Sequence, residues 1–197
     1  MSSEPEGLVR RCQQGELAAF TELFQLYETQ VYRLALTILR NEHDAQDAVQ
    51  DVFLRVFEQI KRYEGRASFK TWLTTIVVNM CRDRLRRRKV RQAISLDWIR
   101  GRASSHNVVE EVADQQYRQA MWRYIDQLDE GLRLPLVLHY LEELPCDEVA
   151  QILKIRTSTV YSRLNTARVK LRAMAQADMG GHGVAGPGRD QVRTSER

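Results

Sequence analysis

The chain has 197 residues, an apolar share of 43% and a formal net charge of only +4, which fits packed globular domains and argues against global disorder. No run approaches the roughly 18 apolar residues of a membrane span, the N-terminus does not resemble a signal peptide, and Cys12, Cys81 and Cys146 are too far apart to indicate a zinc site or a disulfide framework. We therefore expect a soluble, reduced, cytoplasmic protein without a cofactor.

The first half contains three stretches in which apolar residues recur with helical spacing. They run from Phe20 to Ile38, from Ala45 to Ile60 and from Phe69 to Met80. Ser68 stands at a capping position before the third, and Gly65 interrupts the pattern ahead of it. Because three amphipathic helices can bury one another, residues 8–91 are predicted to form a small all-helical domain.

Residues 92–112 lose this periodicity and are predicted to be a linker, because a structureless stretch of this length is unusual inside one compact domain. Its Ile94, Leu96, Trp98 and Ile99 are too apolar for an inert spacer, so we expect this part to dock on a partner.

Helical spacing resumes at Tyr117 and continues through three further segments, "LRLPLVLHYLEEL", "DEVAQIL" and "STVYSRLNTARVKLRAMA". Residues 113–177 are therefore predicted to form a second helical domain, and the Gly-rich residues 178–197 a disordered tail. The predicted fold is all-α, with two small helical domains joined by a flexible linker.

Charge is segregated along the chain although the total is nearly balanced. Residues 42–58 carry five acidic side chains against Arg55 alone, whereas residues 61–91 carry eleven basic and two acidic side chains. Residues 154–172 carry six basic side chains and no acidic one. This pattern indicates two polyanion contacts and one cationic protein partner.

The pair of short helices in the second domain has the spacing of a helix-turn-helix, in which the second helix enters the DNA major groove. Val160, Leu164, Ala167 and Leu171 would face inward, and Thr159, Ser162, Arg163 and Thr166 outward, toward base edges and phosphates. The alternative is a solvated basic helix. The absence of acidic residues for i,i+4 pairs favours DNA.

The stretch "SFKTWLTTIVVNMCRDRLRRRK", residues 68–89, joins an apolar stripe to an arginine cluster. The stripe is expected to leave a polar face exposed, made of Lys70, Thr74, Asn79, Arg82, Asp83 and Arg86. Such a face suits a strand with unstacked or flipped bases. Trp72 shares the spacing of Phe69 and Ile76, which favours a core position over a stacking platform.

Asp44, Asp47, Asp51 and Glu58 lie along one side of the second predicted helix, and a solvated face is the simplest interpretation. The adjacent His43 and Asp44 raise a metal-dependent phosphohydrolase as an alternative. Such a site needs further histidines, and the remaining ones, His106, His139 and His182, lie in other parts of the chain.

Taken together, residues 8–176 resemble the extracytoplasmic-function (group 4) sigma factors of bacterial RNA polymerase. "FTELFQLYETQVYRLA", "AQDAVQDVFLRVFEQI" and "FKTWLTTIVVNMCRDRLRRRK" are similar to the family's region 2. "LVLHYLEELPCDEVAQIL" and "TSTVYSRLNTARVKLR" are similar to its region 4.

The resemblance implies a promoter-specificity subunit with no catalytic activity, whose partners are core RNA polymerase, promoter DNA and, as is common in the family, an anti-sigma factor. Region 2 would bind the melted −10 strand through Ser68, Lys70, Thr71, Trp72, Asn79, Arg82 and Arg86, with phosphate contacts also from Arg84, Arg87 and Arg88. Region 4 would read the −35 duplex through Thr157, Ser158, Thr159, Tyr161, Ser162, Arg163, Thr166 and Arg168. Asp44, Asp47, Gln50 and Asp51 would dock on the polymerase.

Several residues depart from the family's pattern. Tyr161 and Thr166 replace two basic residues, Pro145 replaces a capping Ser, and Ser158 and Lys154 stand where Gly is usual. With only Phe69 and Trp72 as nearby aromatics, we expect weak promoter melting and stringent promoter choice. The rival functions are a stand-alone helix-turn-helix regulator and, more remotely, the phosphohydrolase.

Overall fold

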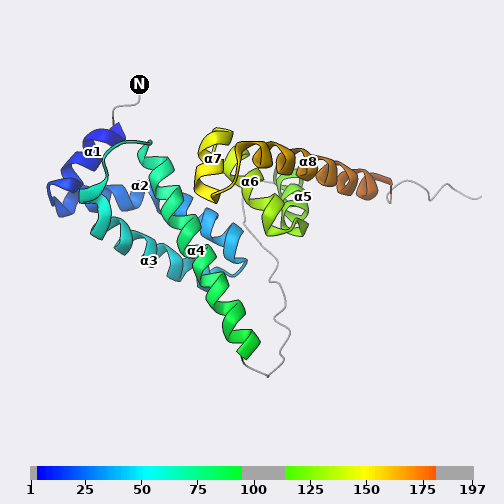
Figure 1. The fold of residues 1–197 in the computed structure, drawn as a ribbon, viewed down its shortest axis with the longest axis horizontal. Helices are drawn as coiled ribbons and strands as arrows, with labels where there is room; N and C mark the ends of the chain where they lie inside the picture. The colour runs from blue at the N-terminus through cyan, green and yellow to red at the C-terminus, as the bar shows by residue number, and fades with distance from the viewer. Residues whose placement is uncertain (1–3, 95–113, 181–197) are drawn as a thin grey trace, which may run out of the picture.

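The computed structural model describes residues 4–94 and 114–180. Within these ranges the chain is helical and contains no strand. Two groups of helices lie side by side, with the long helix α4 crossing between them (Figure 1). The all-α, two-domain prediction is confirmed for the described residues.

The first domain packs four α-helices and a short 3-10 helix. They are α1 (Glu4–Gln13), α2 (Leu17–Leu39), α3 (Glu42–Gln59), η1 (Ile60–Arg62) and α4 (Phe69–Ile94). The predicted stripes supply its core: Leu23 and Ile38 from α2, Val52 from α3 and Val77 from α4 are each at most 1% exposed. The domain is therefore held by apolar faces that the sequence repeats at helical spacing.

The turns between these helices have local causes. Arg40 ends α2 in the left-handed conformation (φ 55°), and its N–H bonds the carbonyl of Leu36. Asn41 then caps α3 by accepting the N–H of Asp44 at 2.8 Å, which satisfies a donor that the first helical turn would leave free. The two residues together reverse the chain within two positions.

The second domain contains α5 (Asp114–Gln127), α6 (Glu130–Tyr140), α7 (Cys146–Leu153) and α8 (Thr157–Gly180). Helix α7 ends at Lys154, which adopts the left-handed conformation (φ 56°) expected of a Gly, at a cost of about 1–2 kcal/mol. Its N–H reaches the carbonyls of Ala150 and Gln151. Pro145 occupies the N-cap position of α7 and provides no side-chain cap, as expected from its place in the sequence.

The element boundaries differ from the predictions in three places. Helix α1 begins at Glu4, before the predicted start of the first domain, and sequence analysis did not recognise it. Helix α4 continues to Ile94, so residues 92–94 are helical and not linker. Helix α8 continues to Gly180, so residues 178–180 are not part of a disordered tail. The rest of the predicted linker and tail lies outside the described residues.

No helix in the described ranges is long and apolar enough to cross a membrane.

Helix α2 has a buried and an exposed face, so truncating a leucine on each face should change the free energy of unfolding by different amounts. Leu23 is fully buried and Leu26 is 57% exposed. Leu23→Ala should lower the free energy of unfolding by about 2–5 kcal/mol, since it leaves a cavity, whereas Leu26→Ala should change it by less than about 0.5 kcal/mol. Urea unfolding followed by circular dichroism measures both. Equal losses for the two variants would contradict this assignment of faces.

Candidate nucleic-acid interface

Helix α8 has the two faces expected of a recognition helix. Val160, Leu164 and Ala167 are at most 2% exposed, which holds the helix against α6 and α7. Tyr161 is 62% exposed, and Ser158, Ser162 and Thr166 are also exposed. The inward and outward assignments are therefore confirmed for these positions, and Leu171, Thr157, Thr159 and Arg163 are half-buried.

Two outward residues of α8 have partners inside the protein. The Arg168 Nε donates a hydrogen bond to the Tyr140 hydroxyl at 2.6 Å, and its guanidinium lies 5.5 Å from the centre of the Tyr140 ring. Thr166 donates to the carbonyl of Ser162 at 3.0 Å. Arg168 is thus held in one orientation by α6, a contact that sequence analysis did not foresee.

Ser68 caps helix α4 as predicted, because its Oγ accepts the N–H of Thr71 at 3.1 Å. Lys70, Trp72 and Asn79 on the following turns are half-buried. Thr71 is only 5% exposed and Thr74 only 1%. The expectation that Thr74 lies on the exposed face is wrong, because its side chain is buried.

An aromatic cluster surrounds the start of α4. The rings of Trp72 and Phe69 lie 5.5 Å apart, and Tyr63 lies 5.3 Å from Trp72 and 5.7 Å from Phe69. The Tyr63 hydroxyl donates to the carbonyl of Ala67 at 2.7 Å, which braces the loop before α4. Sequence analysis missed Tyr63, although an aromatic residue two positions before the turn glycine was a visible signal.

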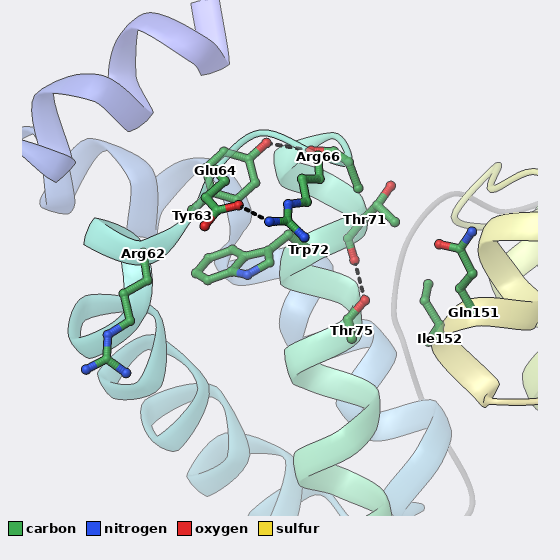
Figure 2. Close-up of a pocket in the computed structure, with 10 residues that line it drawn as sticks. Arg62, Tyr63, Glu64, Arg66, Thr71, Trp72, Thr75, Gln151 and Ile152 are labelled. Carbon is green, nitrogen blue, oxygen red and sulfur yellow. Dashed lines mark hydrogen bonds and ion pairs between the residues drawn. The ribbon is translucent and has the colours of Figure 1, made fainter.

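Beside this cluster lies an open groove of about 450 Å³ (Figure 2). The first domain lines it with Tyr63, Arg66, Thr71 and Trp72, and α7 of the second domain faces them with Gln151 and Ile152. The groove offers an aromatic surface, hydroxyls and a guanidinium together. A flipped base needs such a set of groups.

The arginine cluster of α4 is largely paired with acidic residues. Arg84 donates to the carbonyl of Asp44 and to the Asp51 carboxylate, both at 2.8 Å, and lies 3.7 Å from that of Asp47. The other pairs are Arg82–Glu130 at 3.3 Å, Arg86–Asp83 at 2.9 Å and Arg88–Asp44 at 3.4 Å. Arg87 is exposed and has no such pair among the described residues.

The acidic side of α3 therefore faces the basic end of α4, and Asp44, Asp47 and Asp51 each contact an arginine. Gln50, the fourth predicted docking residue, is exposed. Next to these residues Leu54 and Phe57 are 64% and 51% exposed, an apolar surface that sequence analysis did not single out. This side of α3 thus presents carboxylates next to exposed apolar side chains.

His43 is exposed and lies 3.4 Å from the Asp47 carboxylate. Among the residues that the structure describes, no group of three or more His, Cys, Asp or Glu side chains is arranged to hold a metal ion.

Comparison with known proteins gives a family for each domain. Residues 23–91 match the Sigma-70 region 2 family and residues 118–171 the Sigma-70 region 4 family. The chain is 32% identical over 176 residues to the ECF RNA polymerase sigma factor SigE of Mycolicibacterium smegmatis, covering 87% of this chain and 68% of the relative. It is 31% identical over 154 residues to the ECF RNA polymerase sigma factor SigM of Bacillus subtilis, covering 78% of this chain and 93% of the relative.

Among solved structures, the fold is similar to that of the sigma factor RpoE of Bartonella quintana, determined in complex with the anti-sigma factor NepR. The TM-score is 0.69 and the identity 21%, over 81% of this chain and 98% of that one.

The pairing of α3 with α4 predicts unequal roles for two arginines of the same helix. Arg84→Ala should lower the free energy of unfolding by about 1–2 kcal/mol, because it removes hydrogen bonds to a carbonyl and a carboxylate. Arg87→Ala should change it by less than about 0.5 kcal/mol. Thermal unfolding at low and high salt checks this, and no difference between the variants would mean that the Arg84 contacts contribute nothing to stability.

Proposed function

Because this chain belongs to the extracytoplasmic-function family of RNA polymerase sigma factors and so acts in transcription initiation, we propose that its two domains bind separate promoter elements while both are seated on core polymerase. The observation that carries this proposal is the presence of one polar and basic helix surface on each domain, along α4 from its polar start to its arginine cluster and along α8. The protein would direct initiation at a restricted set of genes.

The first domain is proposed to bind the melted −10 strand. Ser68, Lys70, Thr71, Trp72 and Asn79 would hold an unstacked base, and Arg82 and Arg86 would contact phosphates. The groove beside Trp72 and Tyr63 supports this assignment, since it presents aromatic, hydroxyl and guanidinium groups at one place. Binding only the open strand draws the melting equilibrium toward that strand, so the protein needs no chemical step of its own.

The second domain is proposed to read the −35 duplex through the exposed face of α8. The residues are Thr157, Ser158, Thr159, Tyr161, Ser162, Arg163, Thr166 and Arg168. Hydroxyls and guanidinium groups bond base edges and phosphates, while the exposed Tyr161 adds an aromatic surface to this face. Arg168 is already oriented by Tyr140, so it loses little conformational entropy on binding a phosphate.

Core polymerase is proposed to dock on α3 through Asp44, Asp47, Gln50 and Asp51. The neighbouring Leu54 and Phe57 support this assignment, because exposed apolar side chains beside charged groups are typical of a protein interface. The Arg84 and Arg88 pairs would keep the carboxylates in place before docking.

We further infer that the protein acts in the cytoplasm, performs no catalysis and is controlled by an anti-sigma factor. The solved complex of a sigma factor of similar fold with its anti-sigma factor supports the last point. Phe69 is buried, so the aromatic side chains that line the groove are Tyr63 and Trp72. This small aromatic surface for unstacked bases supports stringent promoter choice.

A reconstitution tests the proposed function against the stand-alone regulator. The purified chain should co-elute with core RNA polymerase. The complex should initiate transcription at defined start sites, which are mapped in cells that overexpress the protein. A promoter with a degraded −10 element should give little transcript. Gel shifts without core enzyme are the control, because a stand-alone regulator binds its duplex site alone. Failure to co-elute, or initiation without promoter preference, would sink the proposal.

Two arginines of α8 at different distances from its N-terminus should contribute unequally to the affinity of the holoenzyme for DNA. Arg163→Ala should weaken holoenzyme binding to a mapped promoter by about 1–3 kcal/mol, because an arginine that meets a base edge or phosphate is lost. Arg172→Ala removes the same charge two to three turns further along the helix and should have a clearly smaller effect, since recognition helices read DNA with their N-terminal part. Filter binding across a salt series measures both, and equal losses would contradict this orientation.

A further inference from the structure

Helix α1, which sequence analysis did not recognise, is bonded to the segment that leads into α4. The side-chain amide nitrogen of Gln13, the last residue of α1, donates hydrogen bonds to the carbonyls of Ile60 at 3.1 Å and Tyr63 at 2.8 Å. Carbonyl oxygens only accept, so both hydrogens of this amide group are used. Gln13 thus joins α1 to two residues that lie 47 and 50 positions further along the chain.

These two carbonyls lie at the two sides of η1. The N–H of Tyr63 donates to the carbonyl of Ile60 at 3.1 Å, which closes the short helix, and Tyr63 itself is extended (φ −71°, ψ 116°). Backbone groups at a helix end lack partners within the helix and need other donors or acceptors. Because Gln13 supplies the donor, a side chain of α1 sets the direction in which the chain leaves η1.

Tyr63 carries this constraint to the groove beside α4. Its hydroxyl donates to the carbonyl of Ala67 at 2.7 Å, and its ring lies 5.3 Å from that of Trp72 and 5.7 Å from that of Phe69 (Figure 2). Burial and, to a smaller extent, the Glu6 carboxylate of α1 raise the pKa of Tyr63, so the hydroxyl remains a donor at neutral pH. The loop before α4 is thus held at its backbone by α1 and across its span by a tyrosine side chain.

Helix α1 is itself fixed to the domain, so it can support the loop. Val9 and Cys12 are 3% and 5% exposed, and Arg11 donates to the carboxylates of Glu16 at 2.9 Å and Glu22 at 3.1 Å. The buried side chains contribute most to this attachment, since exposed ion pairs contribute little by themselves. The amide at the end of α1 therefore starts from an anchored helix.

We propose that Gln13 is a positioning residue for the groove that binds the −10 strand, because its amide fixes the backbone of Tyr63 and thereby the ring that lines the groove. The inference rests on the proposed function and adds a residue outside the assigned binding surfaces. Gln13 is not among the residues that line the groove, so it acts on the strand only through Tyr63.

A fixed ring binds an unstacked base better than a mobile one. Base stacking needs a ring face at a defined tilt, and ordering a mobile side chain or loop on binding reduces affinity. The Tyr63 and Trp72 rings are held at 51° to each other, so the aromatic surface exists before a strand arrives. Loss of the Gln13 hydrogen bonds should weaken strand binding although no contact to DNA is removed.

The test uses holoenzyme reconstituted from core polymerase and the full chain. Q13A removes the amide, and Q13M removes its donors while keeping the length of the side chain. Q14A is the matched control, because Gln14 is the next residue and is exposed. The first probe is a fluorescein-labelled single strand with the non-template −10 sequence of a mapped promoter, followed by anisotropy. The second probe is a duplex fragment with the −35 sequence of the same promoter.

Q13A and Q13M should each weaken strand binding about fivefold, because each removes the hydrogen bonds that hold Tyr63. Q14A should bind the strand like the unaltered chain. All the variants should bind the −35 duplex equally, since the second domain is unchanged. Circular dichroism verifies that each variant is folded.

A double-mutant cycle distinguishes positioning from a general loss of structure. Y63L should weaken strand binding about tenfold, because it removes a stacking surface. Q13A/Y63L should bind no more weakly than Y63L, since Gln13 then has no ring to position. A general loss of structure would instead multiply the two losses and weaken duplex binding as well.

Multiplied losses in Q13A/Y63L, or strand binding by Q13M equal to that of the unaltered chain, would overturn the role of Gln13. If Y63L is still weakened in that case, the assignment of the groove to the −10 strand stands. A Y63L holoenzyme that binds the strand like the unaltered one would refute the groove assignment, and the role of Gln13 with it.

Discussion

The packing of α4 against α2 and α3 is the contact on which the rest of the structure depends. Leu73, Val77, Val78 and Cys81 of this helix are at most 2% exposed, and burial of such side chains contributes about 1.5–3 kcal/mol each. That burial fixes the rotation of α4, and with it the positions of Ser68, Lys70, Trp72 and the arginine cluster. The apolar half of the helix thus holds its polar half at the surface.

The same packing explains how a near-neutral chain can carry a block of eleven basic side chains. Arg84 and Arg88 lie against the acidic side of α3, so much of the repulsion within the cluster is offset inside the domain. The exposed Arg88–Asp44 pair contributes little to stability by itself, whereas the half-buried Arg84 also bonds a backbone carbonyl. The role of these pairs here is to keep opposite charges adjacent on one surface, with the acidic side of α3 available to a protein and the basic end of α4 to a nucleic acid.

The acidic side chains of the second domain extend this arrangement between domains. Glu130, Glu142 and Glu148 meet donors of α2 and α4 at the surface assigned to the promoter.

The sequence by itself determined the all-helical class, the two domains, the cap at Ser68, the two faces of α8 and the family, because these follow from helical periodicity, turn residues and local motifs. It did not reveal α1, the ends of α4 and α8 or the burial of Thr74, since a helix boundary and a buried hydroxyl depend on what packs beside them. Only the tertiary structure decided that the Tyr63 ring packs beside Trp72, that Arg84 bonds residues of α3, and that Glu148 accepts a hydrogen bond from Thr71. These pairs join residues far apart in the chain or on different helices, and no local pattern encodes such distances.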